Sequence, residues 1–168
     1  MTNTTMKTYQ LTQHFALNEF TRSATAIANG IDNSLDLAKA DDRKVAENLQ
    51  YLCQTVLEPL REHFGMPVVI SSGYRCKELN RVVGGVRNSQ HLTGEAADIQ
   101  PLAPVSAGFA CSSSLPLSET LKQWFHFIQD NCRFDQLILE TQGGRQWIHV
   151  STCRNDSRNR QACLTLKR

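Results

Sequence analysis

The longest amphipathic pattern in the chain spans residues 41–64. Apolar side chains recur there every three or four positions, which predicts a helix with one buried face. They are Val45, Leu49, Leu52, Cys53, Val56, Leu57, Leu60 and Phe64. Asp41 or Asp42 can cap the start of this helix, and Gly65 favours its end. Pro59 lies inside the pattern, so we expect a kink or break at the residue before it.

Shorter patterns predict further elements between this helix and residue 130. Residues 68–71 form a short apolar run that is typical of a buried strand, and residues 96–100 predict another strand. Residues 77–83 predict a short helix that ends at two glycines. A second amphipathic helix is expected from Ser118, as its cap, to about residue 130.

The C-terminal third of the chain predicts two strands, at residues 136–140 and 147–151, on either side of a turn at residues 141–146. Residues 101–117 are rich in Pro, Ser, Gly and Ala, and we expect a loop there. Helices mixed with short, mostly antiparallel strands predict an α+β fold, with a small sheet flanked by helices.

Side chains alternate between the two faces of a strand, and this alternation divides the two C-terminal strands into a core face and an open face. Ile148 belongs to the core face, so His149 belongs to the open face. If Glu140 lies across from Trp147, then Ile138 lies across from His149, and Glu140 comes close to His149. A shift of one residue in this register would remove the juxtaposition.

Length and charge narrow the class of protein. A chain of 168 residues favours one domain with a hydrophobic core, which we place at residues 14–160, between a flexible arm (1–13) and a C-terminal tail (161–168). The net charge is +2 without a basic run, so we expect no nucleic-acid partner. No apolar run is long enough to span a membrane. We expect a monomer, although the sequence carries no direct signal of oligomeric state.

The first ten residues are polar and lack the apolar centre of a signal peptide, which predicts synthesis in the cytoplasm. The six cysteines contain no Cys-x-x-Cys spacing, so we expect free thiols rather than a cysteine zinc site.

Three side chains suggest a metal centre. His91 and Asp98 flank Gly94 in the segment SQHLTGEAAD, and His149 follows in Trp-Ile-His. Two imidazoles and one carboxylate suit Zn²⁺, and a catalytic zinc keeps its fourth position open for water or substrate. Gly94 lets the backbone turn tightly between the first two ligands.

These motifs, together with Ser71-Ser72-Gly73-Tyr74-Arg75, Asn80 and Gly84-Gly85, resemble the M15 family of zinc peptidases. This family contains D-Ala-D-Ala carboxypeptidases and dipeptidases, and the nearest likeness is to its short single-domain bacterial and phage members. The resemblance implies the Hedgehog/DD-peptidase fold, a Zn²⁺ cofactor and cell-wall peptides as substrates. A wall substrate lies outside the membrane, so we expect release by a phage-type route.

The resemblance also implies roles for residues around the metal. Arg75 corresponds to an arginine that binds the substrate carbonyl or the transition state; the alternative is a structural arginine paired with an acid. Ser89 is similar to a serine that holds substrate, or it caps a turn. Tyr74 and Trp147 either line the cleft or pack.

The general base departs from the family pattern. Many M15 enzymes carry Asp or Glu three residues before the last histidine, where this chain has Gln146. Glutamine cannot accept the proton, so we take Glu140 as the candidate base, against the alternative of an exposed strand-end carboxylate. Gln146 can instead donate a hydrogen bond to substrate. Its presence also motivates a second hypothesis, a non-catalytic zinc module that binds wall peptide or a protein partner.

Overall fold

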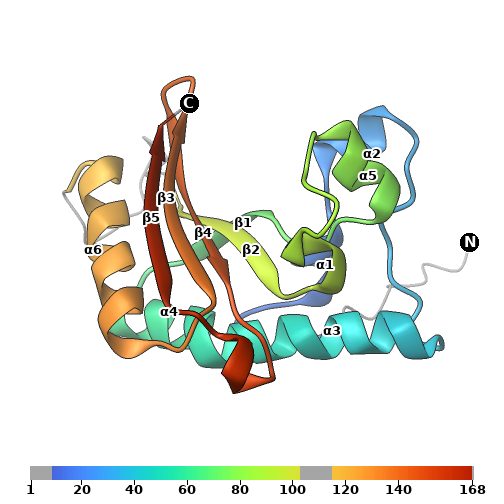
Figure 1. The fold of residues 1–168 in the computed structure, drawn as a ribbon, viewed down its shortest axis with the longest axis horizontal. Helices are drawn as coiled ribbons and strands as arrows, with labels where there is room; N and C mark the ends of the chain where they lie inside the picture. Colours follow the sequence, from blue (N-terminus) through green and yellow to red (C-terminus); the bar gives the residue numbers. More distant parts are fainter. Residues whose placement is uncertain (1–8, 103–114, 168) are drawn as a thin grey trace, which may run out of the picture.

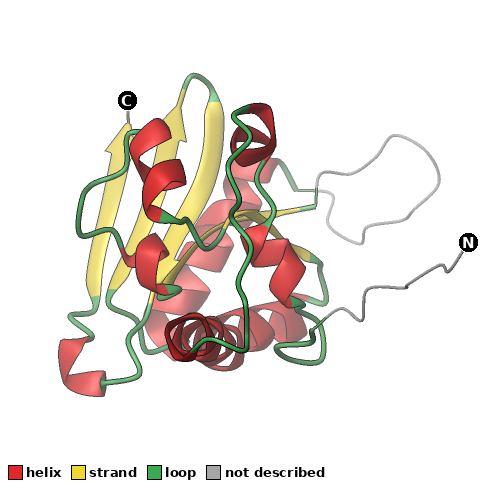
Figure 2. Ribbon diagram, turned by 90° about the vertical axis from the view of Figure 1, so that its right-hand side faces the viewer, coloured by secondary structure: helices red, strands yellow, loops and turns green. Residues whose placement is uncertain are grey.

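A five-stranded sheet lies at the centre of the protein, which the computed structural model describes over residues 9–102 and 115–167 (Figure 1). The strand order is β1-β2-β4-β3-β5, and only β3 and β5 are parallel. Helices lie in front of and behind the strands (Figure 2). The α+β class and the mostly antiparallel sheet are therefore confirmed. The strands are β1 (Val68–Ser72), β2 (Ala96–Pro101), β3 (Gln136–Gln142), β4 (Arg145–Ser151) and β5 (Ala162–Lys167).

The first long helix runs along the lower edge of the view in Figure 1. It comprises α3 (Ala40–Leu52), a π-helical stretch η1 (Cys53–Leu57) and α4 (Glu58–Phe64), and it ends at Gly65 with φ 59°. The irregularity predicted before Pro59 is thus a widened π turn, one of the ways in which a helix accommodates a lost hydrogen bond.

The predicted aspartate cap of this helix is wrong. Helix α3 begins at Ala40 after Lys39, which makes no capping hydrogen bond through its side chain. Asp41 and Asp42 lie in the first turn, where their charge favours the positive end of the helix dipole.

Helix α6 (Leu117–Asn131) covers one face of the sheet and packs on β2, β3 and β4. Its buried residues include Leu121, Trp124 and Ile128, at the predicted helical spacing. Ser118 is not its cap, because Pro116 precedes the first turn and its carbonyl accepts from the Thr120 amide. Most of the loop expected at 101–117 lies outside the described residues.

Strands β3 and β4 form a hairpin with the predicted register, in which Glu140 pairs with Trp147 and Ile138 with His149. The turn is shorter than expected. Gly143 and Gly144 both have positive φ, as a two-residue type I′ turn requires, and the strands extend to that point.

Both predicted ends of the domain differ from the structure. Strand β5 lies in the segment expected as a tail, and it pairs with β3 from Gln136↔Ala162 to Thr141↔Lys167. Near the other end, Leu11 is buried in the core, so the last residues of the expected arm pack on the domain.

The short helices α1 (Leu17–Thr21), α2 (Ala24–Ala28) and α5 (Lys77–Val82) lie beside the sheet, to the right in Figure 1. The 3-10 turn η2 (Gln90–Thr93) contacts α5, α3 and β2, and η3 (Asp156–Arg158) follows β4. None of the described helices is long and apolar enough to cross a membrane.

Candidate metal centre

A cleft of about 830 Å³ opens over the sheet face that α6 leaves uncovered. One wall comes from the segment between α5 and η2, and the floor comes from β2, β3 and β4. Its lining includes Arg75, His91, Asp98, Glu140, Trp147 and His149. The candidate ligand atoms of His91, Asp98 and His149 lie within 4.8 Å of one another.

His91 is fixed by a hydrogen bond to the backbone. Its Nδ1 lies 2.7 Å from the carbonyl oxygen of Gly73, which can only accept, so Nδ1 carries the proton. The other ring nitrogen, Nε2, faces Oδ1 of Asp98 at 3.3 Å. Histidines that bind metals are typically oriented by such a bond from the second ring nitrogen.

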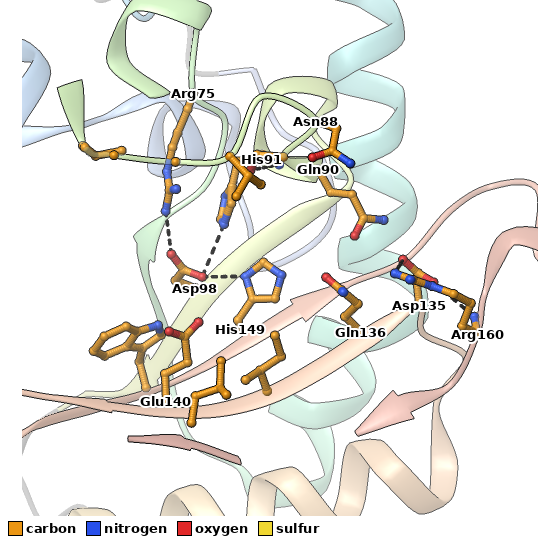
Figure 3. A pocket seen from close by; sticks show the side chains of 18 of the residues that line it. Arg75, Asn88, Gln90, His91, Asp98, Asp135, Gln136, Glu140, His149 and Arg160 are labelled. Atoms are coloured by element: carbon orange, nitrogen blue, oxygen red, sulfur yellow. Dashed lines mark hydrogen bonds and ion pairs between the residues drawn. The ribbon is translucent and has the colours of Figure 1, made fainter. Parts of the chain in front are cut away.

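The carboxylate of Asp98 contacts the side chains of Arg75, His91 and His149 (Figure 3). It lies in the middle of β2, paired with His149 on β4. Burial opposes its ionisation, but the charges of and hydrogen bonds from His91 and His149 hold the pKa of this carboxyl well below its usual range. The side chain is therefore a carboxylate, the form that binds a cation.

His149 completes the group from β4, with Nδ1 2.9 Å from Oδ1 of Asp98. His91 and His149 therefore face the same carboxylate oxygen, and the centroids of their rings are 5.1 Å apart. Two ring nitrogens and a buried carboxylate oxygen are the donor set that zinc takes in catalytic sites. The residues present therefore fit a zinc ion.

Two glycines allow the backbone to bring these side chains together. Gly94, between His91 and Asp98, has φ 72°, and a Cβ there would meet the carbonyl oxygen of Val45 at 2.6 Å. Gly73, whose carbonyl fixes His91, packs so closely on α1 that a Cβ would lie 2.6 Å from the Cα of Phe20. Only glycine fits either position without backbone movement.

Glu140 and Trp147 form a cross-strand pair beside the metal centre, and both line the cleft. His149 is the diagonal neighbour of Glu140 on the same face, and such neighbours lie roughly 7–8 Å apart, within reach of long side chains. The structure thus places Glu140 at the site that strand alternation predicted for it.

Arg75 lies on the far side of Asp98. Its Nη2 donates to Asp98 Oδ2 at 2.8 Å, and its Nε donates to the hydroxyl of Ser72 at 2.9 Å. The side chain is only 16% exposed. This is the structural pairing with an acid that the sequence left as an alternative, although Arg75 also lines the cleft.

Three other predicted substrate contacts have different surroundings. Ser89 lines the cleft, but its hydroxyl accepts from the backbone amide of His91 at 3.4 Å, as a turn cap does. Tyr74 is not in the cleft lining and packs against the core. Gln146 points to the opposite face of β4 from His149 and donates to Thr141 at 3.2 Å. The structure therefore brings neither Tyr74 nor Gln146 into the cleft lining, and their contact with substrate stays a prediction.

Sequence patterns indicate only part of the cleft lining beyond His149. Gln90, Gln136, Asp135 and Arg160 line it (Figure 3). Gln136 could be assigned to the open face from strand alternation. The pairing of Asp135 with Arg160 joins residues 25 positions apart, and no local pattern indicates it.

A comparison with protein families matches residues 13–113 of the chain, more than half of its 168 residues, to the Peptidase M15 family. The match includes His91 and Asp98, and the fold supplies His149 from outside it. A search of curated proteins found no match. The extent of the family match, together with the convergence of the three ligand residues, shows that the chain belongs to the M15 family of peptidases.

Proposed function

We propose that the protein is a zinc-dependent peptidase that hydrolyses peptidoglycan stem peptides. The observation that supports this most strongly is the convergence of His91, Asp98 and His149 in an open cleft of an M15 family member. The finer choice of substrate follows the resemblance to enzymes that act on cell-wall peptides. Candidate bonds are the D-Ala end of the stem and an internal bond such as L-Ala–D-Glu.

In this proposal, His91 Nε2, an Asp98 oxygen and a ring nitrogen of His149 would hold the zinc. The ion supplies Lewis acidity, which polarises a carbonyl and lowers the pKa of water. Asp98 keeps its charge because Arg75 and both histidines surround it. Arg75 acts as a positioning residue, since its fork is already used by Asp98 and Ser72.

Glu140 is the proposed general base. Its carboxylate takes the proton of the attacking water and returns it to the leaving amine. The hairpin register supports this role, because it places Glu140 on the cleft face one pair away from His149. Trp147, across from Glu140, lines the same end of the cleft.

Zinc content and turnover together test the proposal. The purified chain should bind one zinc per molecule and cleave stem peptides, and His149→Ala should lose both properties because one ligand is missing. A chain that binds zinc stoichiometrically but cleaves no stem peptide at any pH tested would contradict the proposed activity.

The second hypothesis, a non-catalytic zinc module, was motivated by Gln146. That residue faces away from His149, so its identity does not bear on a base in the cleft. Glu140→Gln still separates the two hypotheses. An enzyme should lose about 10²- to 10⁴-fold in turnover and keep its zinc. No change in any measured property would favour the binding module or assign the base to another residue.

A further inference from the structure

Two exposed guanidinium groups line the end of the cleft beyond His149. Arg158 and Arg160 are 58% and 62% exposed, whereas Glu95 and Asp135, the carboxylates that they contact, are 9% and 5% exposed. In each pair, therefore, the carboxylate is buried and the guanidinium is exposed to solvent. Both arginines belong to the segment between β4 and β5, outside the family match.

Asp135 holds Arg160 in a defined orientation. Its carboxylate accepts from Nε at 2.6 Å and Nη2 at 2.8 Å, and also from the backbone amide of Arg160 at 3.2 Å. Arg160 Nη1 and the second hydrogen of Nη2 have no acceptor among the described residues. A guanidinium fixed along one edge keeps its other donors available for a ligand at little entropic cost.

Arg158 is oriented in a similar way. Its Nη1 donates to Glu95 Oε1 at 3.3 Å, and the other oxygen of Glu95 accepts from the hydroxyl of Thr93 at 2.9 Å. Gln90 and Gln136 lie in the same part of the cleft and add neutral polar groups. The lining at this end is therefore suited to an anionic group.

Strand geometry places this end relative to the metal centre. Gln136, Ile138 and Glu140 follow one another on the cleft face of β3, and Ile138 pairs with His149. Two residues of a strand span about 7 Å, so Gln136 and Glu140 lie on opposite sides of the His149 position. Figure 3 shows the same order, with Glu140 on one side of His149 and Gln136, Asp135 and Arg160 on the other.

We propose that Arg158 and Arg160 form a subsite for a substrate carboxylate, about two residues along an extended peptide from the bond that is cut. A carboxylate suits the site because it accepts from planar guanidinium donors in a charge-assisted way. The inference rests on the proposed function and adds to it a preference for acidic peptides. A stem peptide that contains D-Glu carries such a group.

Binding of matched peptides tests the subsite without turnover. The probes are L-Ala-γ-D-Glu-L-Lys-D-Ala-D-Ala and two analogues, in each of which one carboxylate, that of D-Glu or of the C-terminus, is a carboxamide. Dissociation constants are measured by calorimetry on the zinc-loaded full chain carrying Glu140→Gln. One analogue should bind about tenfold more weakly than the parent peptide, the loss expected for a charge-assisted hydrogen bond.

Variants of the two arginines test whether these residues cause the weaker binding of the carboxamide analogue. The discrimination is the ratio of the dissociation constants of the analogue and the parent peptide. It should fall to about threefold or less in Arg158→Gln, and also in Arg160→Lys, which keeps a positive charge beside Asp135. Arg154→Gln is the matched control, because Arg154 is also half-exposed and ion-paired, with Glu47, but does not line the cleft. It should leave the discrimination unchanged, and thermal unfolding checks that every variant is folded.

The outcomes separate the subsite from the activity. Equal affinity for all three peptides, or a discrimination that both cleft variants retain, would overturn the subsite. If the native chain cleaves all three peptides equally well, the proposed function stands and the subsite fails. If no peptide binds or is cleaved by folded, zinc-loaded chain, both proposals fail.

Discussion

The carboxylate of Asp98 is held in place by three neighbouring side chains. Both histidines face its Oδ1, and Arg75 donates to its Oδ2. A buried carboxylate with its second oxygen fixed is held ready for a cation, and the groups that orient metal ligands contribute strongly to affinity. The orientation of Asp98 by Arg75 is thus part of the candidate metal centre.

Removing the orienting arginine should weaken zinc binding. In Arg75→Gln we expect zinc affinity to fall about 10- to 100-fold, because Asp98 loses its donor on Oδ2. Competition with a chromogenic chelator measures this. Arg81→Gln, at an exposed position on α5, should change nothing. An unaltered affinity in Arg75→Gln would show that Asp98 is held without Arg75.

Asp135 should make stability depend on pH in the acidic range. The hydrogen bonds from Arg160 lower the pKa of the Asp135 carboxyl, so its folded pKa lies below its unfolded value. Its contribution to stability is therefore present above the unfolded pKa of about 3.9 and is lost as the pH falls through the folded pKa. The melting temperature of the native chain should exceed that of Asp135→Asn at pH 7, and the difference should shrink below pH 4. A difference that stays constant over that range would contradict the pairing.

At the residue scale, the sequence predicts the three candidate ligands, which the fold brings together, better than it predicts the groups around them. His91, Asp98 and His149 stand in recognisable local motifs, and alternation along two strands brings Glu140 to the cleft. The partner of Arg75 was not predictable, because its contact with Asp98 depends on how β2 packs beside the end of β1.

Among the elements, the turn between the first two ligands is the most constrained. Gly94 ends η2 in the left-handed region, close to the backbone of α3. Gly94 lies in the short connection between η2, which contains His91, and β2, which contains Asp98. A Cβ at this position would meet the carbonyl oxygen of Val45 at 2.6 Å, so the backbone between the two candidate ligands would have to move.

Gly94→Ala should therefore destabilise the protein and its metal centre together. Positive φ alone costs an alanine about 1–2 kcal/mol, and the contact with Val45 adds to that cost. Gly65→Ala is the matched control, since Gly65 also ends a helix with positive φ but has nothing within 4 Å of a Cβ. Chemical denaturation should show a clearly larger loss of unfolding free energy for Gly94→Ala than for Gly65→Ala. Equal losses in the two variants would exclude a role for the close contact with Val45.

Alternation and turn residues predict β3 and β4 well, because both strands have one buried face and a glycine turn. The π turn at η1 was expected only as an unspecified break, since Pro59 shows that a hydrogen bond is lost but not how the helix adjusts. The caps at Asp41 and Ser118 failed because Lys39 and Pro116 precede the actual helix starts.

At the scale of the whole molecule, strand β5 is the last strand of the sheet, and it pairs with the edge of β3 that β4 leaves free. Its sequence, ACLTLK, is short and borders the end of the chain, so composition favoured a tail. Its pairing is parallel and follows a connection through η3. Such long-range pairing is decided by the sheet edge that is available, which a local pattern does not reveal.

Removal of β5 should expose that edge and destabilise the fold. Truncation after Arg160 should lower the melting temperature by at least about 5 °C, the shift expected for roughly 2 kcal/mol in a chain of this size. It should also promote aggregation through the open edge of β3. Truncation after Lys167 is the control, and an equal melting temperature for both truncations would mean that β5 adds no stability.

The most direct test of the central claim, a zinc peptidase acting on cell-wall peptides, is mass spectrometry of muropeptides incubated with the zinc-loaded chain. Glu140→Gln and His149→Ala serve as parallel controls. We predict a cleavage product with the native chain alone, whose mass identifies the bond. The absence of any product from folded, zinc-bound native protein, or an equal amount of product from Glu140→Gln, would contradict the account of this site.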